Sequence, residues 1–411
     1  MITRDDCLAL DAADPLARFR DAFELPDGAI YLDGNSLGRL PKAVKPRLDR
    51  LIEQEWGRDL ITSWNVHDWI GLPARVGDKI AQLVGAAPGS VVSADSTSVN
   101  LFKVLAAALA LRPGRSVILS DTGNFPNDLY VAQGLIQTLG GRHELRLVEP
   151  DDVAGAIDER VAVVMLTQVD YRSGRVHDMA ELTRRAHGAD AIALWDLCHS
   201  AGAIPVDLEG ANADLAVGCG YKYLNGGPGA PAFLYVAPRL QDAVKPPLSG
   251  WMGHEAPFAF DLDYRPAAGI GRNLCGTPPV LGMAALDAAL DVMLAADMAE
   301  LRAKSMRLGD LFIDLVEQEC GAFGFTLYSP RQAEARGSQV SIRHEHGYAA
   351  MAALIARGVI GDFRAPDMMR FGFTPLYLGY ADIWDAVAVL RQIMETRAWD
   401  RPEFHRRAAV T

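Results

Sequence analysis

The stretch GCGYKYLNGGPGAPAFLYV, residues 218–236, places one lysine between two tyrosines, where an apolar run ends and a glycine-rich loop begins. Lys222 stands out because the charge of a lysine is costly to remove from water at a buried strand end. A desolvated lysine amine forms Schiff bases with carbonyl compounds, including pyridoxal phosphate. The alternative for this residue alone is a lysine that pairs with a carboxylate at a turn. The stretch therefore predicts a buried amine that is either a nucleophile or half of an ion pair.

Apolar runs around this lysine predict the sheet that carries it. They are short, rich in Val, Ile, Leu and aromatic residues, and bounded by turn residues, at 115–120, 161–167, 191–196, 214–219 and 232–236. Helical patterns lie between them, at 98–111 and 178–188. Such alternation predicts an α/β fold with a mostly parallel sheet that is covered on both faces. Ligands of these sheets bind at the carboxyl ends of the strands, so we expect the chemistry directly after these runs.

The alternation of short apolar runs and helical patterns ends near residue 285. Residues 286–318 read as one long amphipathic helix, and shorter strand and helix patterns follow it. We therefore expect a large α/β domain over 61–285 and a smaller α+β domain over 286–411, with the N-terminal segment 1–60 packed on the smaller one.

Composition limits the possible partners. The 411 residues carry a formal net charge of −12, which argues against non-specific binding to nucleic acid or to an anionic membrane. The five cysteines form no CxxC pair, so neither a disulfide framework nor a metal site is expected. The N-terminus has no apolar signal region, and no apolar run approaches the ~18 residues of a membrane span. A cytoplasmic protein is the expectation.

Two residues upstream of Lys222 support the cofactor interpretation. Asp196 ends the run AIALWD and could pair with a protonated pyridine nitrogen, which makes the cofactor ring an electron sink. His199, three residues later, could lie over or beside that ring. The alternatives are a helix N-cap for Asp196 and a structural histidine for His199. With Lys222 at this spacing, the cofactor interpretation is the better one.

The phosphate of such a cofactor needs an anchor, and its ring needs neighbours. DSTSVN (95–100) opens a predicted helix, where backbone N–H groups and the hydroxyls of Thr97 and Ser98 form an anion site, although an ordinary N-cap is the commoner use. Tyr221 could add a phenolic donor. In NFPNDLY (124–130), Phe125 could stack on the pyridine face and Asp128 could lie near its nitrogen. An aromatic residue after a strand more often belongs to the core.

Together these segments resemble the kynureninase family. The resemblance rests on LDGNSLG (32–38), TSVNL (97–101), FPND (125–128), DLCHSAG (196–202), YKYLNGGPG (221–229) and GWMGHE (250–255), in the family's order and at about its spacing. It spans residues ~30–380. YKYLN together with GWMGHE is the specific part, since a D…K pair alone indicates only the broad fold type I superfamily of pyridoxal-phosphate enzymes.

The resemblance implies a fold type I enzyme that hydrolyses the Cβ–Cγ bond of L-kynurenine to anthranilate and L-alanine, in tryptophan catabolism or NAD biosynthesis. It implies a homodimer with shared active sites. The cofactor would be bound by Thr97, Ser98, Phe125, Asp128, Thr167, Asp196, His199, Tyr221 and Lys222, with Trp251 and Thr277 from the neighbouring subunit. Arg370 would bind the substrate α-carboxylate, Ser36 would lie close to the substrate, and Tyr221 would relay protons next to Lys222. For Arg370 alone, the alternative is a surface arginine.

The sequence departs from the family pattern at a few positions. Ser98 stands where many relatives have Thr, which keeps the hydroxyl. Thr277 and Trp64 replace the Asn and His of animal enzymes at positions facing the substrate ring, and this favours kynurenine over its 3-hydroxy derivative. His67 and Trp69 are close enough to Trp64 to compete for that assignment.

Other functions remain open from the sequence. A cysteine desulfurase or class V aminotransferase would share the fold and the cofactor, but no cysteine here lies in an obvious flexible loop. A non-catalytic binding protein would not need both Lys222 and Arg370. A nicotinamide enzyme would need a GxGxxG motif after an early strand, and none is present.

Overall fold

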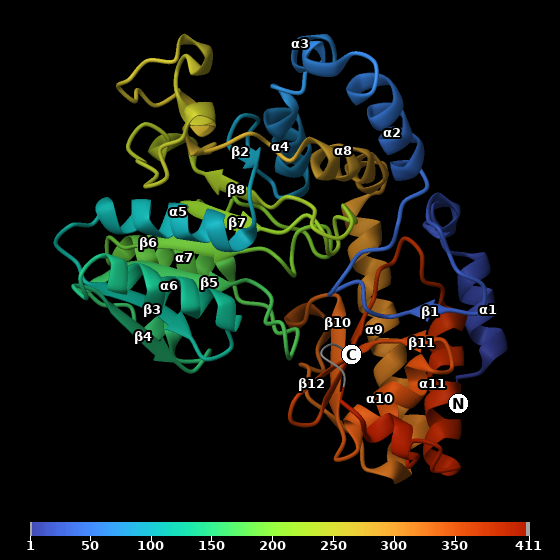
Figure 1. The fold of residues 1–411 in the computed structure, drawn as a ribbon. Helices are drawn as coiled ribbons and strands as arrows, with labels where there is room; N and C mark the ends of the chain where they lie inside the picture. Colours follow the sequence, from blue (N-terminus) through green and yellow to red (C-terminus); the bar gives the residue numbers. More distant parts are fainter. Residues whose placement is uncertain (1, 408–411) are drawn as a thin grey trace. The chain divides into compact units, whose positions relative to one another are not determined.

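The computed structural model describes residues 2–407, which fold into two compact units (Figure 1). The large unit comprises Ala43–Asp170 and His177–Leu294, and the small unit comprises 2–42, Tyr171–Val176 and 295–407 of the described residues. These limits differ from the expected boundaries at residues 60/61 and 285/286. The chain also passes into the small unit for six residues between Asp170 and His177, an excursion that periodicity in the sequence does not reveal.

A seven-stranded sheet forms the centre of the large unit. Its strand order is β2-β8-β7-β6-β5-β3-β4, and the pairs from β7 to β4 are all parallel, whereas β8 is antiparallel to both β7 and β2. The strands are β2 (Val91–Ser93), β3 (Val117–Asp121), β4 (Glu144–Val148), β5 (Val161–Thr167), β6 (Ile192–Asp196), β7 (Leu215–Gly218) and β8 (Phe233–Val236). The prediction of a mostly parallel α/β sheet is confirmed.

The five expected strands are all present. They could be predicted because each is buried along its whole length and is therefore a continuous apolar run. Every residue of β5 and β6 is buried, which requires cover on both faces of the sheet. β2 and β4 were not anticipated. β4 lies at the edge of the sheet and is partly exposed, so it lacks the continuous apolar run of a central strand.

Helices of the large unit cover this sheet and carry its turns. α5 packs on β5, β7 and β8 as well as on α6, and α7 packs on β6. The helices are α2 (Val44–Arg50), α3 (Ser63–Val66), α4 (Leu72–Leu83), α5 (Thr97–Ala110), α6 (Pro126–Thr138), α7 (Met179–Gly188) and α8 (Val280–Leu294). A π-helical turn, η2 (Leu51–Trp56), extends α2, and short 3₁₀ turns lie at Leu60–Thr62, Val153–Gly155, Pro238–Leu240, Trp251–Gly253, Pro257–Ala259 and Gly269–Asn273.

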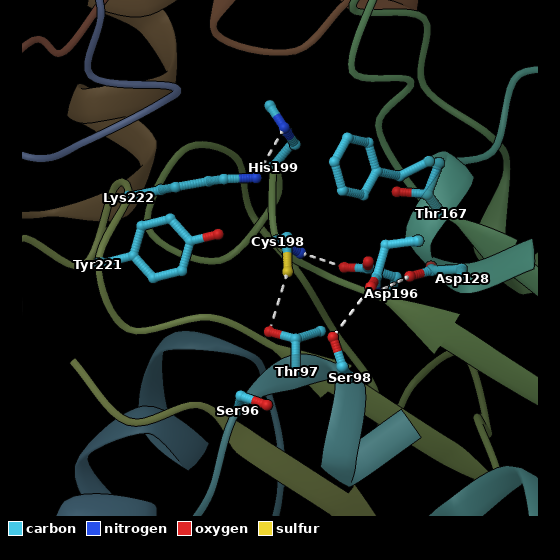
Figure 2. A pocket seen from close by; sticks show the side chains of 12 residues that line it. Ser96, Thr97, Ser98, Asp128, Thr167, Asp196, Cys198, His199, Tyr221 and Lys222 are labelled. Carbon is cyan, nitrogen blue, oxygen red and sulfur yellow. Dashed lines mark hydrogen bonds between the residues drawn. The ribbon is translucent and has the colours of Figure 1, made fainter. Parts of the chain in front are cut away.

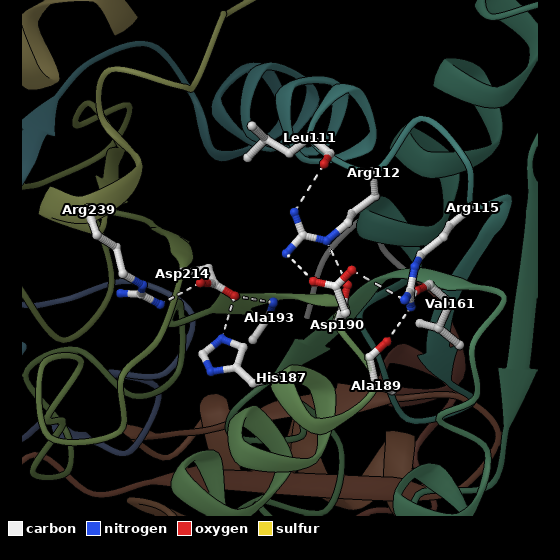
Figure 3. A network of polar contacts seen from close by, with 10 residues as sticks. All are labelled: Leu111, Arg112, Arg115, Val161, His187, Ala189, Asp190, Ala193, Asp214 and Arg239. Carbon is white, nitrogen blue, oxygen red and sulfur yellow. Dashed lines mark hydrogen bonds and ion pairs between the residues drawn. The ribbon is translucent and has the colours of Figure 1, made fainter.

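Two carboxylates, those of Asp190 and Asp214, lie just before the starts of β6 and β7, at the amino-terminal ends of these strands (Figure 3). Asp214 accepts a hydrogen bond from the Ala193 amide at 2.7 Å and pairs with Arg239 at 2.5 Å and His187 at 2.9 Å, so the start of β6 is held against the loop before β7. Asp190 adopts a left-handed backbone conformation, with φ of 56°, in the tight turn before β6. Its carboxylate bridges Arg112 and Arg115.

The small unit is an α+β structure. Its four-stranded antiparallel sheet has the order β12-β13-β10-β9, and a separate parallel pair joins β1 to β11. The strands are β1 (Ile30–Tyr31), β9 (Thr326–Leu327), β10 (Gln339–Arg343), β11 (Val359–Ile360), β12 (Asp362–Arg364) and β13 (Met368–Gly372). The helices are α1 (Arg4–Ala12), α9 (Met298–Cys320), α10 (Gly347–Ile355) and α11 (Tyr380–Glu395), with 3₁₀ turns at Ala17–Ala22, Gly321–Phe323, Ala333–Ala335 and Pro402–His405.

The expectation of one long helix over residues 286–318 is wrong. The segment forms the end of α8 and most of α9, and the two helices belong to different units. Asp297 ends the continuity, because its carboxylate accepts hydrogen bonds from the Ala299 and Glu300 amides and so caps α9. Within residues 2–407, no helix is both long and apolar enough to cross a membrane.

Candidate active site

One cavity of the large unit gathers most of the predicted cofactor residues. Its volume is about 210 Å³. It lies at the carboxyl ends of β3, β5, β6 and β7, where ligands of parallel sheets bind. Nine predicted residues line it together with three that were not predicted: Thr97, Ser98, Phe125, Asp128, Thr167, Asp196, His199, Tyr221 and Lys222, with Ser96, Asn127 and Cys198.

Lys222 reaches this cavity from the loop that follows β7. Its Nζ atom lies 3.0 Å from Nε2 of His199, in the turn after β6, and the two side chains point toward one another in Figure 2. The nitrogen also lies 5.9 Å from the centre of the Phe125 ring and 5.8 Å from that of Tyr221. The contact found for this amine is therefore an imidazole, not the carboxylate that an ordinary turn lysine would pair with.

Two carboxyl groups face the cavity from the side opposite Lys222 (Figure 2). Asp196, the last residue of β6, accepts the Cys198 amide at 2.6 Å, so it caps a turn and not a helix. Asp128, in the first turn of α6, is fully buried. Burial and then the neighbouring charge of Asp196 raise the pKa of Asp128 well above its usual value, which favours the protonated form of its carboxyl group.

The N-terminus of α5 supplies hydroxyl groups and backbone N–H groups to the cavity. Ser96 is the N-cap residue, and its side chain accepts a hydrogen bond from the Val99 amide. Thr97 and Ser98 occupy the first two helical positions. Neither residue is therefore the helix N-cap that was the alternative to an anion site. Ser98 Oγ donates to Asn127 at 2.9 Å, and Thr97 Oγ1 lies 3.7 Å from Cys198 Sγ. This end of the helix suits an anion.

Three further residues complete the lining. Phe125 is 43% exposed, so it is not the core residue that its position after a strand suggested. Thr167 ends β5 and is buried. Burial raises the pKa of the Tyr221 phenol, which keeps the hydroxyl protonated and able to donate. The cavity thus offers an amine, an aromatic ring, an anion site and a carboxyl pair.

Trp251, Thr277 and Trp64 do not line this cavity. Trp251 and Thr277 are exposed at the surface of the large unit. Trp64 packs edge-on against Trp69 with ring centres 5.9 Å apart, and Trp69 in turn donates to Glu55 at 2.9 Å. The roles assigned to these three residues remain predictions.

Arg370 and Ser36 belong to the small unit, where they meet a carboxylate that the sequence analysis missed. Arg370 is 2% exposed, so the surface alternative for it is wrong. Its Nε donates to Asp362 Oδ1 at 2.6 Å, and its Nη2 donates to Asp362 Oδ2. Ser36 Oγ donates to Asp362 at 2.9 Å and accepts from Arg370 at 3.3 Å. The Tyr171 carbonyl accepts from Arg370 Nη1.

Sequence reasoning could have found part of what it missed. Asn127 lies inside the FPND motif, and Ser96 and Cys198 adjoin predicted residues, so their neighbours were the signal. Asp362 had no such signal, because it meets Arg370 only through the antiparallel register of β12 and β13. Asp33, whose buried Oδ1 atom has no hydrogen-bond partner, was likewise not anticipated.

The cysteines are free thiols at all five positions. Among residues 2–407, no group of three His, Cys, Asp or Glu side chains could hold a metal ion. Cys198 is part of the cavity wall. Hydrogen bonding to Cys219 and then burial raise the pKa of Cys198, which disfavours the reactive thiolate there.

Curated relatives match the whole chain. A kynureninase of Burkholderia pseudomallei strain 1106a is 54% identical, and one of Pseudomonas fluorescens is 53% identical, each over 416 aligned residues that cover all of both chains. The chain belongs to the kynureninase family. A family model described as the kynureninase C-terminal domain also matches residues 301–390.

Solved structures with low sequence identity share the fold of this kynureninase-family chain. A cysteine desulfurase from Thermococcus onnurineus NA1 is 20% identical with a TM-score of 0.78, over 92% of this chain and 98% of that one. A C-DES variant with glycine covalently linked to its PLP cofactor is 17% identical with a TM-score of 0.78, over 90% and 98% of the two chains. The fold type I class is confirmed.

Proposed function

We propose that this member of the kynureninase family hydrolyses L-kynurenine to anthranilate and L-alanine. The observation that carries the proposal is the cavity in which Lys222, His199, Asp196 and the N-terminus of α5 converge. Full-length identity of 54% to a protein named kynureninase supports the same reaction.

The cofactor is pyridoxal phosphate, and the residues of the cavity fit it. Thr97 and Ser98 would bind its phosphate with the N–H groups of α5, and Phe125 would stack on its ring. Asp196 would hold a proton at the pyridine nitrogen, with Asp128 beside it as a neutral donor. Lys222 would bind its aldehyde carbon. When bound, the cofactor supplies an electron sink that stabilises negative charge at the substrate Cα.

Lys222 and Tyr221 are the proposed proton carriers. As a free amine, Nζ of Lys222 would accept the proton from the substrate Cα. His199, 3.0 Å from Nζ, orients that amine. Tyr221 keeps its phenolic proton because burial raises its pKa, and it donates that proton as charge develops on the substrate.

Arg370, Ser36 and Trp64 are the proposed substrate residues. The planar guanidinium of Arg370 matches a carboxylate, so it binds the α-carboxylate of kynurenine. Ser36 lies beside Arg370 in the small unit. Trp64 packs against the substrate ring, and Trp64 and Thr277 together disfavour the 3-hydroxy substrate.

We further propose a cytoplasmic homodimer that takes part in tryptophan catabolism. The support is that Trp251 and Thr277 are cofactor candidates by family resemblance, yet both are exposed and outside the cavity of their own chain. A symmetric dimer brings such residues to the partner's site.

Two observations weigh against a desulfurase on the same fold. The cysteine desulfurase from Thermococcus onnurineus NA1 is 20% identical and so indicates the fold alone. Cys198, the cysteine of the cavity wall, has a pKa raised by its hydrogen bond to Cys219 and by burial, whereas a nucleophilic cysteine needs the opposite shift.

The test is an absorbance spectrum of the purified protein, followed by addition of L-kynurenine with detection of anthranilate fluorescence. We expect the visible absorbance of lysine-bound cofactor and release of anthranilate. If the protein is yellow but releases no anthranilate, the proposed reaction is refuted and the cofactor assignment stands. A protein that stays colourless with added pyridoxal phosphate would refute both.

A further inference from the structure

The small unit contains a buried charge cluster whose centre is Asp362. Asp362 accepts from Arg370 through both carboxylate oxygens and from Ser36 through one of them. Arg364, on the same strand, also pairs with Asp362 Oδ2 at 2.8 Å. The side chains of Asp362 and Arg370 are only 3% and 2% exposed, so this ion pair is shielded from solvent.

The β-sheet fixes the pair in place. Asp362 and Arg370 are directly opposite each other in the antiparallel register of β12 and β13. Side chains of opposed residues lie on the same face of the sheet, so the two groups meet without adjustment of the backbone. Ser36 reaches the pair from the loop after β1, a segment more than 300 positions away in the chain.

Stability alone gives little reason for such a pair. A buried ion pair loses in desolvation about as much as it gains in attraction, and apolar residues of similar volume often serve as well. A bidentate carboxylate, however, fixes the plane of a guanidinium group, because one edge of the fork is then occupied in a set geometry. Once one edge is fixed, the direction of the other N–H groups, which donate to Ser36 and to the Tyr171 carbonyl, is fixed too.

The charges of the cluster indicate the kind of ligand that it suits. Arg364 and Arg370 carry two positive charges, and Asp362 supplies one negative charge. Asp33 is the other acid nearby, and burial together with the charge of Asp362 raises its pKa to about 7, so it is largely neutral below that pH. The cluster then has an excess of positive charge, which an anionic ligand compensates.

We propose that Asp362 is a positioning residue that orients the Arg370 guanidinium for the substrate carboxylate. This inference rests on the proposed function, because it takes Arg370 as the group that binds the α-carboxylate. Asp362 itself does not touch the substrate. It acts by binding one edge of the Arg370 guanidinium group, and Ser36 is hydrogen-bonded to both Asp362 and Arg370.

The test compares Asp362→Asn with wild type and with Asp367→Asn. Asp367 follows β12, is half-exposed and lies 3.5 Å from Arg343, so its replacement removes an equal charge from the same hairpin without reaching Arg370. We expect Asp362→Asn to raise KM for L-kynurenine about tenfold or more and to lower kcat far less, because ground-state binding is what is lost. Asp367→Asn should leave KM unchanged.

Titration of the bound cofactor's spectrum separates orientation from general damage. L-Alanine carries the α-carboxylate, and ethylamine has the same amine and carbon skeleton without it. Asp362→Asn should weaken L-alanine binding about tenfold and leave ethylamine binding unchanged. An unchanged or lower KM, or equal weakening of both ligands, would overturn the proposal. If wild type released no anthranilate, the proposed function would fail, while this titration would still decide the inference.

Ser36→Ala keeps the test decisive if Asp362→Asn does not fold. It removes one hydrogen bond to Asp362 and one from Arg370 and leaves the ion pair itself. We expect a KM increase of about twofold to fivefold, because Arg370 loses one supporting hydrogen bond but keeps its bidentate pair with Asp362. In the double variant the two effects should be less than additive, because both residues act through Arg370. No change in KM for Ser36→Ala, or full additivity, would contradict a shared role.

Discussion

The Nζ atom of Lys222 lies 3.0 Å from Nε2 of His199, although the two residues are 23 positions apart in the chain. Both follow neighbouring parallel strands, β7 and β6, so their loops emerge at the same edge of the sheet. The half-buried amine makes its close polar contact with an imidazole, while the carboxyl groups of Asp196 and Asp128 lie on the opposite side of the cavity. This arrangement suits a lysine that reacts with a carbonyl carbon.

Lys222→Ala should lose both turnover and the visible absorbance of the lysine-bound cofactor. The methyl group of alanine cannot bond to an aldehyde. Lys45→Ala is the matched control, because Lys45 forms an exposed pair with Asp49 on α2. Absorbance and anthranilate release measure the two effects. A yellow, active Lys222→Ala protein would contradict the assignment.

Arg370→Lys should raise KM for L-kynurenine by about tenfold or more while the cofactor stays bound. Lysine keeps the charge but lacks the planar fork that engages Asp362 and a carboxylate. Steady-state kinetics give KM, and the absorbance spectrum reports the cofactor. Wild-type KM in this variant would place the carboxylate-binding residue elsewhere.

Asp33→Asn should change how stability depends on pH. Burial and then Asp362 raise the pKa of Asp33 from 3.8 to about 7. Between these values the native protein holds a proton that the unfolded chain has lost, so the free energy of unfolding falls as pH rises. The asparagine side chain of the variant has no such proton to lose. The unfolding free energy of the variant relative to wild type should therefore rise between about pH 4 and 7, by up to about 1.4 kcal/mol per pH unit.

Urea unfolding of both proteins across this pH range measures the difference. Asp27→Asn, at an exposed position of the same unit, serves as the control and should follow wild type. Parallel stability profiles for Asp33→Asn and wild type would mean that Asp33 titrates normally.

Inactive variants should complement each other if the dimer shares its active sites. Lys222→Ala lacks the reactive amine, and Trp251→Ala lacks a residue proposed to reach the neighbouring subunit. After subunit exchange, a mixed dimer has one site with both native residues, so about a quarter of wild-type activity should return. Activity is measured before and after mixing. No gain after proven exchange would show that each chain builds its own site.

Lys103→Met should lower the free energy of unfolding, although Lys103 has no proposed role in the reaction. Lys103 is a fully buried lysine whose Nζ lies 2.7 Å from Asp95 and 2.7 Å from the Asn273 carbonyl. Loss of one partner leaves the carboxylate and the carbonyl unpaired, which costs about 3–5 kcal/mol. Chemical denaturation measures this loss. A stability within about 1 kcal/mol of wild type would mean that solvent compensates for the missing ammonium group.

The sequence by itself determined five of the seven strands of the large sheet and most of the cofactor cavity. Buried parallel strands are continuous apolar runs, so β3, β5, β6, β7 and β8 are visible in the residues. The residues after such strands share one edge, and therefore Asp196 and Lys222 could be placed together before the fold was known, whereas Thr167 came from the family resemblance.

Only the tertiary structure decided the contacts that depend on register between distant segments. Asp362 meets Arg370 because β12 and β13 pair in one alignment, and a shift of one residue would turn each side chain to the other face. The break between α8 and α9 could not be predicted from the sequence either. An aspartate that caps a helix and one inside a helix look alike in an amphipathic pattern. Periodicity reports which residues are buried, and pairing between strands decides which buried residues meet.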